Sequence, residues 1–256
     1  LQGYSYAASG SGRGVDLNND VIAASGTVSM SGQHNTGATY AISLSGSTSI
    51  TAGTGVTLES LNDNTGTIAL LSSGGIDGGS GTVLMRAANY AFGGADRTIT
   101  TTGVLTIEPD ADENSFASSF DNQYLNPVSV TGLTLGKSSN ASAITLSRAI
   151  SLSGPVSIYG GSIDVNANIT ANSGNILLDA DTGSTLNQSS TGILLDDVIT
   201  IETVTSGNLT LIGRSGDTGS GFDGIDASSA NTTTLRSAGN LTLQGYSYAA
   251  SGSGRG

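Results

Sequence analysis

Apolar and polar residues alternate along this chain in short runs, and many of these runs begin at a glycine. The recurring unit is Gly-x-φ-x-φ, where φ is an aliphatic residue or Met. Alternation places the φ side chains on one face of a short strand, and the glycine marks the turn that enters the strand. The unit recurs about every 22 residues. It occurs at 26–30, 55–58, 66–70, 81–85, 103–107, 132–135, 154–158, 174–178, 192–195, 207–211 and 239–243.

The same alternation fills the segments between these units, and no segment has a capped apolar stripe of helical period. Sandwiches and barrels close after seven or eight strands, whereas this chain carries many more short strand candidates. A repeat of about 20–25 residues with two or three strands is typical of one coil of a parallel β-helix. We therefore predict an all-β fold, a β-solenoid of about 11 irregular coils. Val, Ile and Leu should form inward ladders, with Ser, Thr and Asn ladders at the turns.

The sequence LQGYSYAASGSGRG occurs at 1–14 and again, without a change, at 243–256. The shift between the copies is 242 residues, and the strand pattern runs into the second copy without a break. We expect residues 1–256 to be a single solenoid segment, one repeat of a tandem array plus a 14-residue overlap, taken from something longer. Both ends should then be open, because a solenoid that stops needs a polar cap. Eleven coils predict an axial repeat on the order of 50 Å.

Composition narrows the class of partner. The net charge is −12 with only eight basic residues, which excludes a nucleic-acid binder, because such a protein needs a basic face. No apolar run approaches the ~20 residues of a transmembrane segment. The chain has no Cys, which leaves the redox compartment open. Its acidic composition, poor in Lys and rich in Ser, Thr, Asn and Gly, favours export.

Two longer segments resemble a known family. They are GVLTIEPDADENSFASSF (103–120) and GLTLGKSSNASAITLSRAISLSGPVSIYGGSIDVNANITANSGNILL (132–178). Together with GNLTL and GTVSMSG, they resemble the repeat region of filamentous haemagglutinin-like giant bacterial surface adhesins. The resemblance implies a right-handed parallel β-helix, export across the outer membrane and a place at the cell surface. It implies no catalytic or binding residues, because the matched motifs are solenoid coils.

The longest stretch without the glycine unit is 109–131, which we expect to be a protruding loop. It holds Phe116, Phe120 and Tyr124, three of the chain's twelve aromatic residues. Their rings either fold back over the flank of the solenoid or form a contact patch for a partner or a neighbouring filament.

Part of the same stretch is similar to a calcium-binding loop. Asp110, Asp112 and Asn114 match its first three ligand positions. The sixth position is Ser115 in place of Gly, and the twelfth is Asp121 in place of Glu. The family resemblance explains the segment better as a structural loop, so we expect neither a metal nor a cofactor.

Parallel β-helices also include polysaccharide-degrading enzymes, which need two carboxylates on one groove, about 5–9 Å apart. Asp77, Asp164, Asp179 and Asp181 are candidates for such a cluster. Asp196 and Asp197 are adjacent, so on a strand they would face opposite ways. The single His34 stands in a turn-like context, where a solvated side chain is expected. We therefore expect no enzyme.

Three functions stay open at this point. The first is a structural repeat of a secreted bacterial surface fibre, built by identical repeats stacked end to end. The second is an adhesin stalk or receptor-binding module for host or cell-surface glycans. The third is a polysaccharide-degrading enzyme. We predict the first, with an extracellular or cell-surface location.

Overall fold

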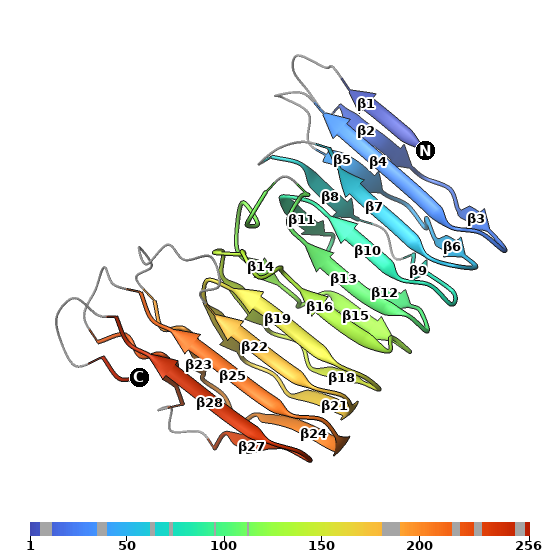
Figure 1. Cartoon of the computed structure of the whole chain (residues 1–256). Helices are drawn as coiled ribbons and strands as arrows, with labels where there is room; N and C mark the ends of the chain where they lie inside the picture. Colours follow the sequence, from blue (N-terminus) through green and yellow to red (C-terminus); the bar gives the residue numbers. More distant parts are fainter. Residues whose placement is uncertain are drawn as a thin grey trace. The chain divides into compact units, whose positions relative to one another are not determined.

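The structure is a computed structural model, and it consists of β-strands joined by turns and loops. It describes residues 1–5, 12–34, 40–61, 65–71, 74–94, 96–111, 113–180, 190–216, 221–227, 232–248 and 254–256. Every regular element of these residues is a strand, as Figure 1 shows, and the all-β prediction is confirmed for them. No helix in these ranges is long and apolar enough to cross a membrane.

The chain divides into two compact units. Unit 1 comprises Leu1–Ser118 and Tyr124–Thr131, and unit 2 comprises Ser119–Gln123 and Gly132–Gly256. Each unit holds strands of three sheets, and within a unit the strands of one sheet are every third strand of the chain. The strand pairs within each unit are parallel. The chain therefore visits the three sheets in turn and then returns to the first.

Unit 1 has a main sheet and two shorter-stranded sheets. The main sheet contains β1 (Gln2–Ser5), β4 (Val28–His34), β7 (Val56–Ser60), β10 (Val83–Arg86) and β13 (Val104–Glu108). The second contains β2 (Arg13–Leu17), β5 (Tyr40–Leu44), β8 (Thr67–Leu70) and β11 (Asn89–Phe92). The third contains β3 (Val21–Ala23), β6 (Ile50–Ala52), β9 (Ile76–Asp77), β12 (Arg97–Thr100) and β15 (Leu125–Val128).

Unit 2 repeats this plan. Its main sheet contains β16 (Gly132–Leu135), β19 (Val156–Gly160), β22 (Ile176–Ala180), β25 (Leu209–Arg214) and β28 (Leu241–Tyr246). The second sheet contains β14 (Phe120–Asp121), β17 (Ile144–Leu146), β20 (Ile163–Val165), β23 (Ile193–Leu195) and β26 (Ile225–Asp226). The third contains β18 (Ile150–Leu152), β21 (Ile169–Ser173), β24 (Thr200–Ser206) and β27 (Thr234–Arg236). In both units the order is consistent with a parallel β-solenoid.

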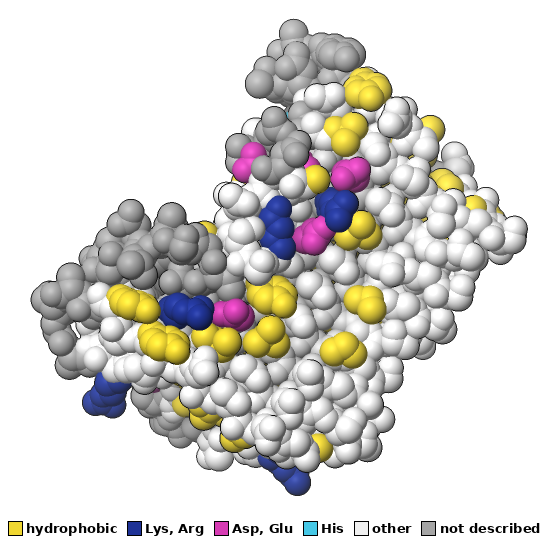
Figure 2. Space-filling view, viewed as in Figure 1, with side chains coloured by type: hydrophobic (Ala, Val, Ile, Leu, Met, Phe, Trp, Pro, Cys, Tyr) yellow, Lys and Arg dark blue, Asp and Glu magenta, His cyan; other side chains and the backbone are white. Residues whose placement is uncertain are grey.

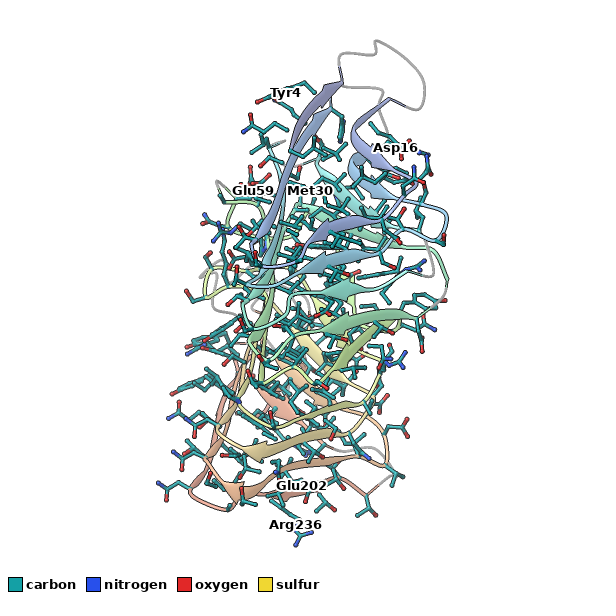
Figure 3. The ribbon with its side chains drawn as sticks, turned by 90° about the vertical axis from the view of Figure 1, so that its right-hand side faces the viewer. Tyr4, Asp16, Met30, Glu59, Glu202 and Arg236 are labelled. Carbon is teal, nitrogen blue, oxygen red and sulfur yellow. The ribbon has the colours of Figure 1, made fainter. Side chains whose placement is uncertain are left out.

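The core of each unit is a set of aliphatic columns that run across the paired strands. In unit 1 one column is Val28, Val56, Val83 and Leu105, and the next is Met30, Leu58, Met85 and Ile107. All of these side chains are buried. Figure 3 shows Met30 between the sheets and Glu59 on the outer face. Burial of one such side chain contributes about 1.5–3 kcal/mol, and no single coil can achieve it alone.

The turns before the main-sheet strands explain two features of the sequence pattern. Gly207 has φ +110°, and a Cβ there would lie 1.9 Å from the carbonyl oxygen of Gly174. Only glycine fits such a close approach between coils. Asn175, Asn208 and Asn240 form the predicted ladder. The Oδ1 atoms of Asn175 and Asn208 each accept a hydrogen bond of 2.9 Å from the backbone N–H of the next Asn.

The structure differs from the sequence-based expectation at two places. The Gly-x-φ-x-φ motifs at 66–70 and 192–195 form β8 and β23, which belong to the second sheets. The number of these motifs therefore does not equal the number of coils. Segment 109–131, expected to be a protruding loop, contributes two short strands, β14 and β15, to the sheets. Pro127 lies in β15, at the edge of its sheet, where a missing N–H is tolerated.

Candidate functional site

The candidate site is the pair of end strands, β1 and β28, which carry the two copies of the repeated sequence. In unit 1, the backbone N of Leu1 donates to the oxygen of Ser29 (2.8 Å), and the N–H of Ser31 donates to the oxygen of Leu1 (2.9 Å). Leu1 therefore points its backbone groups at β4. Because these groups alternate along a strand, those of Gly3 also face β4, whereas those of Gln2 and Tyr4 face away.

β28 uses the opposite edge of the same sequence. The N–H of Leu209 donates to the oxygen of Asn240, and the N–H of Ser215 donates to the oxygen of Tyr246, both at 2.9 Å. By the same alternation, the backbone groups of Gln244, the counterpart of Gln2, face β25. Those of Leu243, the counterpart of Leu1, face away, toward an edge that no described strand covers.

The last main-sheet strand also leaves core side chains uncovered. Leu241 and Leu243 stand in register with Leu209 and Leu211 of β25. The inner pair is 0% exposed, while Leu241 is 47% and Leu243 is 52% exposed. Tyr246 of the same strand is also exposed. Inward leucines therefore face solvent because the strand is covered on one side only, within the part of the chain that the structure describes.

Beyond the strand, the two copies share a local geometry. A Cβ on Gly3 would lie 1.9 Å from the oxygen of Gly14, and a Cβ on Gly245 would lie 2.2 Å from the carbonyl carbon of Gly256. Their neighbours again lie on opposite sides. Arg13 pairs with Tyr40 in the following strand β5, whereas the oxygen of Arg255 accepts a hydrogen bond from the preceding Gly224.

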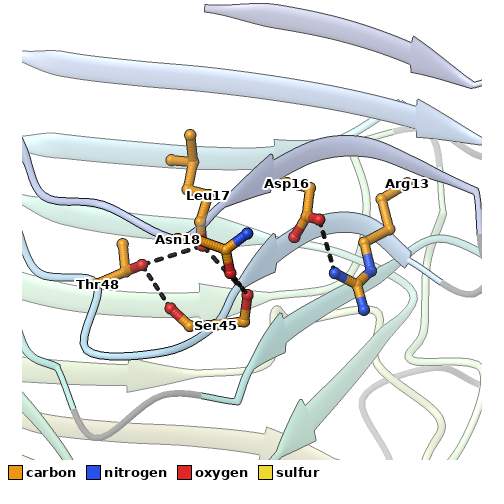
Figure 4. Close-up of polar contacts among 6 residues, drawn as sticks. All are labelled: Arg13, Asp16, Leu17, Asn18, Ser45 and Thr48. Atoms are coloured by element: carbon orange, nitrogen blue, oxygen red, sulfur yellow. Dashed lines mark hydrogen bonds and ion pairs between the residues drawn. The ribbon is translucent and has the colours of Figure 1, made fainter.

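Side-chain contacts at the start of unit 1 hold the strand that continues from the first copy. Arg13 Nη1 lies 2.7 Å from Asp16 Oδ2, as Figure 4 shows, and its guanidinium stacks on Tyr40 at 5.9 Å. Thr48 Oγ1 donates to the backbone oxygens of Leu17 (3.0 Å) and Ser45 (2.6 Å). The bond from Thr48 to Leu17 and the stacking of Arg13 on Tyr40 connect one coil to the next.

Arginines on the outer faces pair with carboxylates of neighbouring strands, and Figure 2 shows small groups of mixed sign. In unit 1, Arg86 lies between Glu108 (Nε–Oε1 2.5 Å) and Glu59 (Nη1–Oε1 3.8 Å). The hydrogen bond to Glu108, opposed by burial, raises the pKa of Arg86. These pairs link coils and leave the face without a strong charged patch.

Unit 2 holds a similar pair beside the second copy. Arg214 Nη1 lies 3.1 Å from Asp179 Oδ1, and its guanidinium stacks on the ring of Tyr246 at 5.6 Å. Burial raises the pKa of Asp179, and Arg214 counteracts part of that shift. The ring of Tyr246 stacks in turn on Tyr248, with centroids 6.5 Å apart.

The aromatic residues expected at a partner contact are mostly inside the fold. Phe116 is buried in unit 1, where its ring meets the edge of Tyr90 at a centroid distance of 5.9 Å. Phe120 is buried in β14 of unit 2, and Tyr124 is half-buried. The burial of Phe116 and Phe120 favours rings that fold back onto the solenoid over rings that form an exposed contact patch.

The residues considered as calcium ligands differ in their surroundings. Asp110 is buried, and its Oδ1 accepts a 2.6 Å bond from the N–H of Ala111. Its backbone oxygen accepts another from Glu113, which closes a turn. Asn114 is exposed, and Asp112 lies outside the described residues. No three His, Cys, Asp or Glu side chains gather into a metal-binding group in the described ranges.

Three of the four carboxylates considered for a catalytic cluster have a structural partner. Asp77 accepts a hydrogen bond from the N–H of Gly79, Asp164 accepts one from Asn166, and Asp179 pairs with Arg214. Asp181 lies outside the described residues. The prediction that His34 is solvated was wrong: it ends β4 and is buried, because the strand runs on past its expected end.

Two features were not anticipated from the sequence. Asp77 borders an open groove of about 210 Å³ on β6, β9 and β12, and hydroxyl side chains line it. They belong to Ser49, Thr51, Thr98 and Thr100. The opposite use of the two copies was also missed, although the duplication itself signalled it. Compared with known proteins, the chain matches no family model, no curated protein and no solved structure.

Proposed function

We propose that this chain is a structural repeat of a secreted bacterial surface fibre, a right-handed β-helical rod that grows by end-to-end continuation. One observation carries the proposal. The strands β1 and β28, which carry the start of the two identical copies, pair through opposite edges of one strand sequence. A single strand of this sequence could therefore join a preceding coil to a following coil with all of its backbone groups satisfied.

The exposed leucines favour the same function. Covering Leu241 and Leu243, each about half exposed, would gain about 2 kcal/mol in total. The added strand would also satisfy the outward backbone groups of Leu243 and Gly245. A rod of this kind needs no catalytic residues for its function, because continuous ladders of backbone hydrogen bonds make it stiff. The acidic composition, with only eight Lys and Arg residues, and the family resemblance support an extracellular or cell-surface location for the fibre.

A second candidate is a receptor-binding or adhesin module, and the groove beside Asp77 favours it. Hydroxyl and carboxylate side chains are the groups that bind the hydroxyls of a sugar. The groove is shallow and has no aromatic ring for a sugar to stack on. Binding of the isolated chain to a glycan array, abolished by Asp77→Ala, would favour this function over a purely structural one.

The fibre is tested with chains of one, two and three repeats, joined at the natural period of 242 residues. Electron microscopy and small-angle scattering measure their lengths. A fibre repeat predicts rods of constant width that lengthen by roughly 40–50 Å with each added repeat. Globules joined by linkers, without a constant increment, would contradict the proposal. A three-repeat chain with Gly245→Val at each internal joint serves as the control.

A further inference from the structure

The proposed fibre can be deepened to the strand register of its joint. We infer that β28 of one copy pairs with β4 of a second copy of this chain, in the place where β1 lies now. The inference rests on the proposed function. Leu243 has the sequence position of Leu1, so it would donate to the oxygen of Ser29 and accept from the N–H of Ser31. Gln244 would then lie opposite Ser31, as Gln2 does.

Core side chains match in this register. Leu1 lies between Ser29 and Ser31 and hence opposite Met30, so Leu243 would stack on Met30 of the second copy. Two residues earlier, Leu241 would stack on Val28. The columns Leu211–Leu243–Met30 and Leu209–Leu241–Val28 would then be continuous and aliphatic, like those inside each unit. A slip by one residue would turn these leucines to the outer face.

The second sheet fits the same joint. The oxygen of Arg255 already accepts a bond from Gly224 of its own chain. Its sequence counterpart Arg13 pairs forward, with Tyr40 and Asp16. Arg255 would therefore form the Asp16 ion pair of the next molecule while it keeps its present neighbour.

A consequence follows for a chain that carries both copies. The edge of β4 has room for one strand, and β1 already occupies it. Joining two such chains therefore requires that segment 243–256 of one displaces segment 1–14 of the other. A tethered copy has an effective concentration on the order of 1 mM, so at ~10 µM chain it outcompetes the untethered copy by roughly a hundredfold. In a chain that carries both copies, β1 therefore competes with β28 of another copy for the edge of β4.

Two matched full-chain variants test this exchange. Gly3→Val places a side chain against the oxygen of Gly14 and so releases the resident copy. Gly245→Val makes the same change against Gly256 and so disables the incoming copy. We expect Gly3→Val to form end-to-end oligomers at roughly a hundredfold lower concentration than the original sequence. Gly245→Val and the double variant should stay monomeric in sedimentation velocity.

Thiol crosslinking reports the register directly, since the chain has no Cys of its own. With a short bis-maleimide, the pair Gln2→Cys and Ser31→Cys should link within one chain. Chains with Gln244→Cys should link to chains with Ser31→Cys, more in the Gly3→Val background than in the original. The free peptide LQGYSYAASGSGRG should compete with this link and stop growth.

Equal oligomer formation by Gly3→Val and Gly245→Val would overturn the inference. Should Gly3→Val fail to fold, the original sequence still provides the test. As the chain concentration rises, the crosslink between chains must increase and the crosslink within a chain must decrease. Crosslinks between chains whose yield changes with neither the chain concentration nor the Gly3→Val substitution would overturn the inference as well. Failure here, with covalent tandem chains that still form rods, would leave the fibre standing and refute only strand exchange.

Discussion

The adjacent leucines of β22 offer a direct test of the inward columns. Leu178 is fully buried and stands in one column with Ile158 and Leu211, which are also fully buried. Leu177 has the opposite face of the strand and is only half-buried. The same substitution, Leu→Ala, can therefore be made at neighbouring positions of one strand that differ in the face they present.

The expected magnitudes follow from burial. Leu178→Ala removes a packed side chain and leaves a cavity between two neighbouring coils, which costs about 3 kcal/mol. Leu177→Ala loses only part of a transfer free energy, about 1 kcal/mol or less. Urea unfolding followed by circular dichroism measures both, with an unchanged slope as the sign that the unfolded state is the same.

The ranking is the decisive result of this experiment. A larger loss of unfolding free energy for Leu177→Ala than for Leu178→Ala would mean that β22 presents its other face to the core. Equal small losses would mean that the columns are not packed across coils. Either outcome would refute the packing on which the solenoid assignment depends.

Three further predictions concern the turns and the titrating groups. Gly207→Ala should lower the free energy of unfolding by about 1–3 kcal/mol, because of its positive φ and the near carbonyl, whereas Gly26→Ala, with open space around it, should be neutral in the same urea assay. Burial raises the pKa of Tyr90 well above its ordinary value of about 10, with the charge of Glu108 adding to the shift. The neutral side chain therefore stabilises the fold fully below about pH 10, and this stability is lost as the pH rises further. Urea midpoints measured from pH 8 to 11 should fall with pH in the original chain and fall less steeply in Tyr90→Phe. Arg214→Gln should raise the pKa of Asp179 further, since burial then acts alone. The loss of stability relative to the original chain should thus be largest near pH 7 and shrink toward pH 4, and a constant difference would contradict it.

Much of the local structure follows from the sequence alone. The alternation of GNILL and GNLTL requires strands with one apolar face, and their glycines and asparagines predict the turns and the ladder of Asn175, Asn208 and Asn240. The exact repeat of residues 1–14 as 243–256 pointed to a shared role for the two segments. These features depend on neighbours in sequence, which is why a pattern of period two is enough to predict them.

Only the tertiary structure decided which strands pair and which side chains that pairing buries. The units at 66–70 and 192–195 look like the others, yet they lie in the second sheets. Phe116 is buried against Tyr90 of β11, which is distant in sequence, and His34 is buried at the end of β4. The opposite edges of the two copies are likewise a property of pairing: one sequence presents two edges, and the neighbouring coil decides which edge is used.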